Sequence, residues 1–449
     1  MRQQFRGAWA MAALTLALGA CGGQDPEAQA AAGSDSAAAA GDSVAGAPAT
    51  VAAPTNEAPA QIRGLYINAY AAGSKTRLPK LIAMADSTEI NTFVVDVKSE
   101  RGVHYNTSVP LAKELQQQGE NTLRDLKAFV DTLHAHDIYT MARIVIFKDP
   151  ILSKAKPEWS IRRADGSLWV DKAGNTWVSA WDSDVWDYNL DIAEEAAKAG
   201  FDEIQFDYVR FPEPYASLPP QVHPEAKGDR TDAIAAFLNE AKKRIHPLGA
   251  VVAADVFGLS PNDPQDVNIG QQWETIAATA DHVLPMMYPS HYLPVHLPGV
   301  SKPDLMPYET LYKSAGMARI RNDRLSEAGV RPARVIPWLQ AFTATWLGNH
   351  LDYGPQQLRD QKRGVYDVGF DDWVLWHPGS KYEPILAGLD REAQSHAKSS
   401  YTPPPEVLSV VELFEKQGVR TARDKAAAQA RGDTSDPTAA QAAKTGKAE

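Results

Sequence analysis

The stretch FDEIQFDYVRFP, residues Phe201–Pro212, decides the fold of this chain. Its apolar Ile204 and Phe206 alternate with polar neighbours, which is the period-two pattern of a strand. The opposite face presents Gln205 and Asp207 just before a proline ends the strand. Burying an ionised carboxylate is costly unless it is paired or used in chemistry. An aspartate near the carboxyl end of a core strand is typical of α/β barrels, which carry their active sites there.

Strand-like and helix-like segments alternate around this stretch. The expected strands are Ile62–Ala71, Asn91–Ser99, Ile138–Phe147, Phe201–Phe211, Ala250–Phe257, His282–Tyr288, Arg334–Phe342 and Phe370–His377. The expected helices are Leu78–Ser87, Leu123–Ala135, Val185–Ala199, Asp232–His246, Gln271–Ala280, Tyr308–Ala328, Pro355–Val368 and a last piece near Tyr382–Lys398. The pattern predicts an α/β protein with a single (β/α)8 (TIM) barrel. A doubly wound open sheet is the alternative, but Asn68–Gly73 lacks its glycine-rich phosphate turn.

The two ends of the chain differ in composition from the middle. Residues 22–60 are dominated by alanine, glycine, serine and proline, so we expect a flexible tether. Residues 421–449 lack a hydrophobic stripe, so we expect a disordered tail. The predicted organisation is a signal peptide over 1–21, the tether, the barrel over 61–398, a C-terminal extension over 399–420 and the tail.

The start of the chain resembles a bacterial lipoprotein signal peptide. Arg2 and Arg6 precede a short apolar run that ends in Leu18-Gly19-Ala20-Cys21. A positive start and a short apolar core are typical of an export signal rather than of a membrane span. The resemblance implies lipidation of Cys21, which would anchor the protein to a bacterial membrane on its periplasmic or cell-surface face. An ordinary secretory signal is the alternative.

Composition excludes several classes of function. The 449 residues carry a formal net charge of −11, which argues against nucleic acid as a partner because phosphates need a basic surface. Cys21 is the single cysteine, so no internal disulfide and no cysteine-based metal site are expected. The 44% hydrophobic content is enough for a sizeable core.

In a barrel, alternate residues of each strand point into the lumen, and those near the carboxyl ends line the active site. This phase brings polar or aromatic side chains from all eight expected strands to one end, the first strand offering Tyr66 and Asn68. The candidate site residues are Asp96, Lys98, Arg143, Gln205, Asp207, Arg210, Asp255, Tyr288, His291, Trp338, Gln340 and Trp376. Any one of them can be a cap, a salt-bridge partner or core packing. A purely structural barrel, however, would need large apolar residues at that end.

These residue types indicate a carbohydrate ligand, because aromatic rings stack on sugar C–H faces while planar polar groups bind hydroxyls. The long connection between Asp149 and Asp184 fits this interpretation, since it carries several tryptophans and follows a barrel strand. It extends the cleft, or forms a hairpin that uses its own tryptophans as a small core, or does both. The tryptophans are Trp159, Trp169, Trp177 and Trp181.

A resemblance to a known family rests on three segments. They are Phe201–Pro212, Ala254–Gly258 and Met286–Tyr292, with Val95–Lys98 and Trp338–Phe342 as further pieces. They resemble the bacterial "putative glycoside hydrolase domain" family, whose members are α-amylase-like or chitinase-like barrels. The resemblance covers roughly residues 62 to 385. It implies an enzyme that hydrolyses glycosidic bonds.

Comparison with better-known sugar hydrolases implies roles for two carboxylates. The chitinase pattern D-x-x-D-x-D-x-E is disfavoured because Gln205 and Val209 stand at two of its acidic positions, the catalytic glutamate included. The amylase arrangement places Asp207 as nucleophile and Asp255 as general acid, although amylases use a glutamate acid and an arginine at position 205. We therefore expect a glycosidase in which Asp207 is the nucleophile or the water-activating base and Asp255 the acid.

Two other functions remain open. A non-catalytic polysaccharide-binding lipoprotein would keep the same barrel and aromatic residues. A metal-dependent hydrolase would use Asp96, Asp207, Asp255 and His291, but no spacing here resembles a metal motif. No metal or cofactor is therefore expected, and the expected partners are a carbohydrate substrate and, through Cys21, a membrane.

Overall fold

A computed structural model describes residues 53–432. Within these residues, a parallel sheet closes into a barrel, because β1 pairs both with β2 and with β10. The barrel strands are β1 (Arg63–Ile67), β2 (Thr92–Ser99), β4 (Tyr139–Val145), β5 (Glu203–Asp207), β6 (Val251–Phe257), β7 (His282–Met286), β8 (Arg334–Val335), β9 (Trp338–Gln340) and β10 (Trp373–Trp376). The seventh position is split between β8 and β9. The predicted TIM barrel is confirmed, and the open-sheet alternative is wrong.

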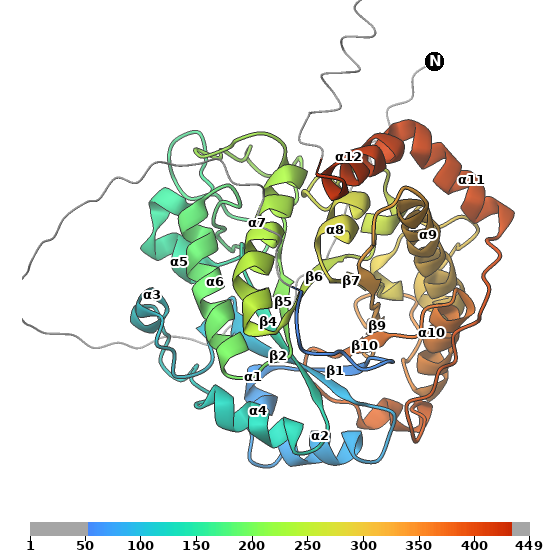
Figure 1. The fold of residues 1–449 in the computed structure, drawn as a ribbon, viewed down its shortest axis with the longest axis horizontal. Coiled ribbons are helices and arrows are strands. Elements are labelled where there is room, and N and C mark those ends of the chain that lie inside the picture. Colours follow the sequence, from blue (N-terminus) through green and yellow to red (C-terminus); the bar gives the residue numbers. More distant parts are fainter. Residues whose placement is uncertain (1–52, 433–449) are drawn as a thin grey trace, which may run out of the picture.

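The helices surround the strands (Figure 1). Those between the strands are α1 (Ala69–Ala72), α2 (Leu78–Ala85), α3 (Pro110–Glu114), α4 (Leu126–His134), α5 (Pro150–Ala155), α6 (Ser183–Lys198), α7 (Arg230–Ile245), α8 (Trp273–Thr279), α9 (Pro307–Glu327) and α10 (Pro355–Asp367). Their apolar faces pack on the outward side chains of the strands, such as Val95, Ile144, Phe206 and Val252. The lumen holds a second apolar cluster that includes Val94, Met141, Leu284, Ile336 and Val374.

The amino-terminal end of the barrel is closed by side-chain caps. Asn91, Asp202, Asp281 and Asp372 each stand just before a strand. Each accepts a hydrogen bond from a backbone N–H at the start of the neighbouring strand, at 2.8–2.9 Å. Unpaired backbone groups at a buried strand end are costly, so these caps stabilise the closed end.

Two predictions for the C-terminal part are wrong. The piece near Tyr382–Lys398 forms only the short 3₁₀ segment η6 (Glu383–Gly388), followed by irregular chain. The expected disordered tail begins with a helix, α12 (Arg420–Ala430), which follows α11 (Pro405–Phe414). In Figure 1 both lie on the outside of the barrel, where α12 contacts α8 and α11 contacts α9.

Helix α12 has no stripe of large apolar residues, which explains the wrong prediction. It buries small Ala426 and Ala427 instead, and alanine is the strongest helix former. Lys425 pairs with Asp232 of α7. At the other end, residues 55 and 56 of the expected tether donate backbone hydrogen bonds to the carbonyl of Gly249. Residues 1–52, which include Cys21, and residues 433–449 lie outside the described residues.

Candidate active site

Three acidic side chains and one arginine converge at the carboxyl end of the lumen. Asp96 comes from β2, Arg143 from β4, Asp207 from β5 and Asp255 from β6. All four are inward residues in the strand period and all are buried, with Asp207 6% and Asp255 1% exposed. The shared end follows from the parallel sheet, because the carboxyl ends of parallel strands meet at one face of the barrel.

Arg143 is the centre of this network. Its guanidinium bonds to Asp96 through Nη1, and to Asp207 Oδ2 through Nη2 and through Nε at 3.0 Å. Burial acts to lower the pKa of Arg143, but the carboxylates of Asp207 and Asp96 outweigh it and raise the pKa well above its ordinary value. The guanidinium is therefore charged, and it holds two carboxylates inside the barrel.

Asp255 lies in a different environment from the other two acids. Its Oδ1 accepts hydrogen bonds from Trp338 Nε1 at 2.7 Å and from Gln205 Nε2 at 3.1 Å. Its Oδ2 lies 4.0 Å from Arg143 Nε, beyond hydrogen-bond reach. Burial, and next the negative charge of Asp207, raise the pKa of Asp255 well above its ordinary value. One carboxyl of the pair is therefore held by an arginine, and the environment of the other favours its protonated form.

The chain turns sharply directly after Asp207. Tyr208 has φ +52°, in the left-handed region, and its N–H donates to Asp207 Oδ1 at 2.5 Å. A bulky residue with positive φ is strained, and such strain collects at functional sites. The predicted strand continued to Phe211, but β5 ends at Asp207 because this turn breaks the alternation. The turn fixes the carboxylate of Asp207 at the mouth of the lumen.

A cavity of about 230 Å³ opens above the network. Its walls include Arg143, Asp207, Asp255 and several aromatic rings. Six of the residues expected from the sequence, besides the two acids, line it: Arg143, Arg210, Tyr288, His291, Trp338 and Trp376. Arg210 is wedged among the rings of Trp177, Tyr208 and Phe257, with its guanidinium carbon 4.5–5.0 Å from their centroids, and it pairs with Glu213.

Lys98 does not point into the lumen, so that expectation is wrong. The register between β2 and β4 slips at Val97, because Asp96 pairs with Arg143 and Lys98 with the next residue. Such a bulge turns the following side chain to the other face of the sheet. Lys98 therefore lies outside the barrel, with its Nζ 2.8 Å from Asp149 Oδ2 and 5.6 Å from the ring of Tyr188 on α6.

Gln340 and Gln205 support the cavity from behind and are not among the residues that line it. Gln340 Oε1 accepts the N–H of Ser290 at 3.0 Å, and its Nε2 donates to Asp304 at 3.3 Å. Gln205 holds Asp255, as described above. Both amides act on neighbouring protein groups rather than on the cavity.

Other residues of the site are missing from the set expected from the sequence. Tyr66, which the sequence placed in the lumen but not in the candidate set, donates to Asp96 Oδ2 at 2.5 Å and stacks on Trp376 at 3.9 Å. Phe257 and Gly258 line the cavity directly after the strand that carries Asp255. A Cβ on Gly258 would lie 2.3 Å from the carbonyl oxygen of Met286, so only glycine fits there.

The tryptophan-rich insertion forms antiparallel bridges and packs its tryptophans into the apolar layer around the barrel. Ser160–Val178, Arg162–Leu168 and Val170–Thr176 pair as antiparallel bridges. Trp169 and Trp177 are buried, with their indole N–H groups donating to Pro219 O and Asp171 Oδ2. None of the four tryptophans lines the central cavity. The antiparallel pairing is therefore confirmed, but the tryptophans join the outer apolar layer of the barrel instead of a small core of their own, and they do not extend the central cavity.

Residues 53–432 show neither a metal-binding cluster nor a helix that could span a membrane. No group of three or more His, Cys, Asp or Glu side chains in this part of the chain is arranged to hold a metal ion. The charged Arg143 occupies the space between Asp96 and Asp207, where a cation would otherwise balance them. No helix in the described part is both long and apolar enough to cross a bilayer.

Comparisons with known proteins place the barrel in a family. Residues 64–382 match the model of the "Putative glycosyl hydrolase domain" family. No curated protein matches the chain. A hypothetical protein of known structure from Ruminiclostridium thermocellum is 34% identical over 43% of this chain and 97% of its own, with a TM-score of 0.39.

Two sugar hydrolase structures are also similar. The PgaB (BpsB) glycoside hydrolase domain from Bordetella bronchiseptica is 15% identical over 71% of this chain and 95% of its own, with a TM-score of 0.51. Alpha-L-fucosidase isoenzyme 2 from Paenibacillus thiaminolyticus is 17% identical over 73% and 48%, with a TM-score of 0.47. At these identities the first of the two supports the fold alone. The match from β1 to the segment beyond β10 shows that this chain belongs to the "Putative glycosyl hydrolase domain" family.

Proposed function

We propose that this protein is a glycosidase that hydrolyses a poly- or oligosaccharide with Asp207 as nucleophile and Asp255 as general acid. The observation that carries the proposal is the contrast between the two buried carboxyls. Asp207 is bound by the Arg143 guanidinium, whereas Asp255 receives only neutral donors and has a raised pKa. Glycoside hydrolysis needs one ionised and one protonated carboxyl at the scissile bond.

The position of the pair favours retention of anomeric configuration. Asp207 Oδ2 lies 3.0 Å and Asp255 Oδ2 4.0 Å from the same Arg143 Nε, so these two oxygens are at most about 7 Å apart. Retaining enzymes separate their carboxyls by about 5–5.5 Å and inverting enzymes by about 6.5–9.5 Å. A separation of at most about 7 Å between the two oxygens includes the whole range of retaining enzymes and only the lowest part of the range of inverting enzymes.

The reaction then has two steps. A carboxylate oxygen of Asp207 bonds to the anomeric carbon as the glycosidic C–O bond breaks, and Asp255 gives its proton to the departing oxygen. In the second step the Asp255 carboxylate takes a proton from water. The oxygen of that water attacks the anomeric carbon and frees Asp207.

The surrounding residues fit the binding of a sugar ring. Tyr288, Trp338 and Trp376 supply aromatic surface in the cavity, and Arg210 is held at its wall. Tyr66 and Asp96 hold Arg143 from the side opposite Asp207, which keeps the guanidinium aligned. Burial lowers the pKa of His291 to about 4, so this ring is a neutral hydrogen-bonding group near pH 7.

We further propose that the enzyme works on a bacterial membrane surface, anchored through a lipid on Cys21. The support is the basic, short apolar segment that ends at this cysteine. Fractionation of the producing cells tests this location, because a lipid-anchored protein stays with the membranes after a high-salt wash, whereas an electrostatically bound one is released.

The function itself is tested by a screen of bacterial cell-wall and exopolysaccharide glycans for the release of reducing ends. Wild type should cleave at least one glycan, and Asp207→Asn should lower that rate about 1,000-fold or more because the nucleophile is lost. A folded Asp207→Asn protein with full activity would contradict the assignment. Glycan affinity without new reducing ends, unchanged in Asp207→Asn and Asp255→Asn, would instead favour a non-catalytic polysaccharide-binding protein.

A further inference from the structure

A second cavity adjoins the catalytic one and shares His291 and Tyr292 with it. This groove has a volume of about 660 Å³ and runs between the segment after β7 and the segment after β9. The catalytic cavity, at about 230 Å³, is smaller than the roughly 300–1,000 Å³ typical of small-molecule sites. An extended substrate must therefore continue outside it.

A path of aromatic rings leads from the catalytic cavity into the groove. Tyr288 contacts Phe342 at a centroid distance of 5.9 Å, and Phe342 stacks on Trp346 at 5.9 Å with an interplanar angle of 25°. His291 meets the edge of Trp346 at 6.2 Å. Phe342 lines neither cavity and packs against Trp346. The lining aromatic surface is that of Tyr288 and His291 in the catalytic cavity and of His291 and Trp346 in the groove.

Trp346 is the unusual member of this path. It is 50% exposed, whereas the other tryptophans of residues 53–432 are buried or half-buried. Tryptophan is enriched among the residues that dominate binding. Ser290, Lys302 and Asn349 line the same groove and offer polar groups for hydroxyls.

The order of the strands shows on which side of the Asp207–Asp255 pair the groove lies. Around the barrel, β5 with Asp207 is followed by β6 with Asp255, then by β7 and β9, whose exits form the groove. The groove thus lies on the Asp255 side of the pair. The general acid protonates the departing oxygen, so the leaving part of the substrate lies on that side.

We propose that this groove binds the sugar units on the leaving-group side of the cleaved bond, with Trp346 as their stacking platform. The inference rests on the proposed glycosidase function and narrows its substrate class. The substrate is a chain with at least one further sugar beyond the cleaved bond, rather than a glycoside of a small alcohol.

The test compares two substrates of the same sugar in wild type and Trp346→Ala. On a polysaccharide that the wild type cleaves, kcat/KM should fall at least about tenfold, the size of a lost stacking contact. On the glycosyl fluoride of the released sugar, whose leaving group is a single atom and leaves the groove empty, kcat/KM should stay within about twofold. Trp346→Phe should retain most of the polysaccharide activity, because it keeps an aromatic face.

Leu413→Ala is the matched control, because Leu413 is 51% exposed on α11 and lies outside the groove. It should leave both activities unchanged. Equal losses on both substrates in Trp346→Ala would overturn the proposal, because Trp346 would then only support the catalytic cavity. Wild-type polysaccharide activity in Trp346→Ala would overturn it too.

A binding measurement separates this inference from the proposed function. Native gels containing glycol chitin, xylan, dextran or alginate should retard the wild type in at least one case, and Trp346→Ala less. Retardation without hydrolysis of any glycan would remove the glycosidase function and leave the binding groove. Hydrolysis with equal retardation of both proteins would remove the groove and leave the glycosidase. No retardation in any gel would contradict the groove.

Discussion

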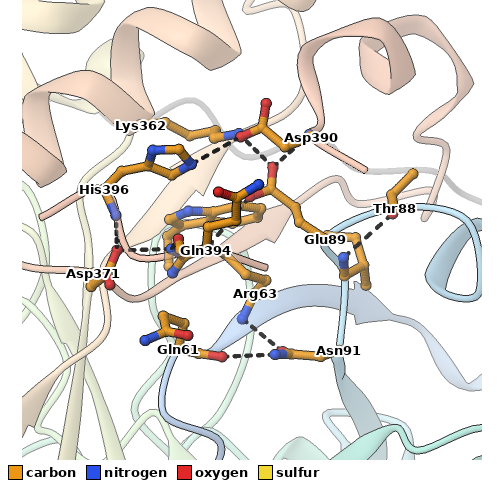
Figure 2. Close-up of polar contacts among 12 residues, drawn as sticks. Gln61, Arg63, Thr88, Glu89, Asn91, Lys362, Asp371, Asp390, Gln394 and His396 are labelled. Atoms are coloured by element: carbon orange, nitrogen blue, oxygen red, sulfur yellow. Dashed lines mark hydrogen bonds and ion pairs between the residues drawn. The ribbon is translucent and has the colours of Figure 1, made fainter. Parts of the chain in front are cut away.

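The two ends of the barrel bury ionisable groups in opposite ways. At the closed end, a cluster named here the basal cluster joins Arg63, Glu89, Lys362, Asp371 and Asp390 (Figure 2). At the open end, three carboxyls of Asp96, Asp207 and Asp255 share the single guanidinium of Arg143. Acidic groups outnumber the buried cation where the cavity lies. Burial, together with this surplus of acidic groups, raises the pKa of Asp255.

In the basal cluster each of the three carboxylates pairs with Arg63 or Lys362. Lys362 pairs with Glu89 and, at 3.0 Å, with Asp390 Oδ2, and Arg63 pairs with Asp371 at 2.8 Å. The Arg63 guanidinium also lies 5.3 Å and 5.4 Å from the rings of Tyr366 and Trp373. In Figure 2 the five charged side chains converge from β1, α10, the segments before β2 and β10, and the segment after η6. The cluster fastens the segment after η6 to the first strand and to α10.

The two ends of the barrel separate the buried charges that stabilise the fold from those that serve chemistry. Buried charges that are fully paired fix the structure, and removal of one partner leaves the other uncompensated. Buried charges in an unbalanced set shift pKa values and serve catalysis at some cost in stability. Substitutions at the closed end should therefore change stability, and substitutions at the open end should change activity.

The largest expected effect on stability is at Glu89. Glu89→Gln removes the buried carboxylate shared by Lys362 and Arg63, so the free energy of unfolding should fall by about 3–5 kcal/mol. Denaturant unfolding measures the loss. Asp131→Asn is the control, because it breaks an ion pair with Lys127 whose side chains are 69% and 58% exposed, and it should cost no more than about 0.5 kcal/mol. Equal losses in the free energy of unfolding in the two variants would contradict the stabilising role of the basal cluster. A folded Glu89→Gln enzyme without activity would contradict it too.

A smaller effect is expected in the pH dependence of the free energy of unfolding, which has opposite signs for one carboxyl at each end of the barrel. Burial acts to raise the pKa of Asp281 at the closed end, but hydrogen bonds from His246, Lys242 and a backbone N–H outweigh it and lower the pKa to about 2. The stability from Asp281 is therefore present above about pH 4 and is lost as the pH falls toward 2. The pKa of Asp255 is raised, so its stability is present below about pH 4 and is lost as the pH rises toward its folded-state pKa.

Each carboxyl contributes a slope of at most about 1.4 kcal/mol per pH unit to the free energy of unfolding. Asp281→Asn should remove the part of the pH dependence in which the free energy of unfolding falls as the pH drops below about 4. Asp255→Asn should remove the part in which the free energy of unfolding falls as the pH rises above about 4. Unfolding curves at several pH values check both variants. A wild-type slope above pH 4 in Asp255→Asn would show that this group does not titrate as described.

The sequence was sufficient for the barrel because its signals are local. Alternating apolar residues such as Ile204 and Phe206 mark strands, and eight of these alternate with helical patterns. The same period places Asp96, Arg143, Asp207 and Asp255 in the lumen. Placing them there does not predict that Arg143 bonds two of the acids and only approaches the third, because that depends on the register of four strands.

The wrong predictions come from effects that no local pattern carries. A one-residue bulge at Val97 turns Lys98 outward, and bulges depend on how two distant strands pair. The left-handed turn at Tyr208 ends β5 early at a residue type that seldom adopts it. Helix α12 buries alanines, which resemble linker composition until the surface that they cover is known.

The central claim is that Asp255 is kept protonated for catalysis and not for stability. Asp255→Asn tests it most directly, because an asparagine Oδ1 can still accept the hydrogen bonds from Trp338 and Gln205 but its amide cannot donate a catalytic proton. The rate of reducing-end release should fall about 100- to 10,000-fold, while the free energy of unfolding near pH 7 stays the same or rises. A rate close to that of the wild type, or a loss of stability as large as that of Glu89→Gln, would contradict the account.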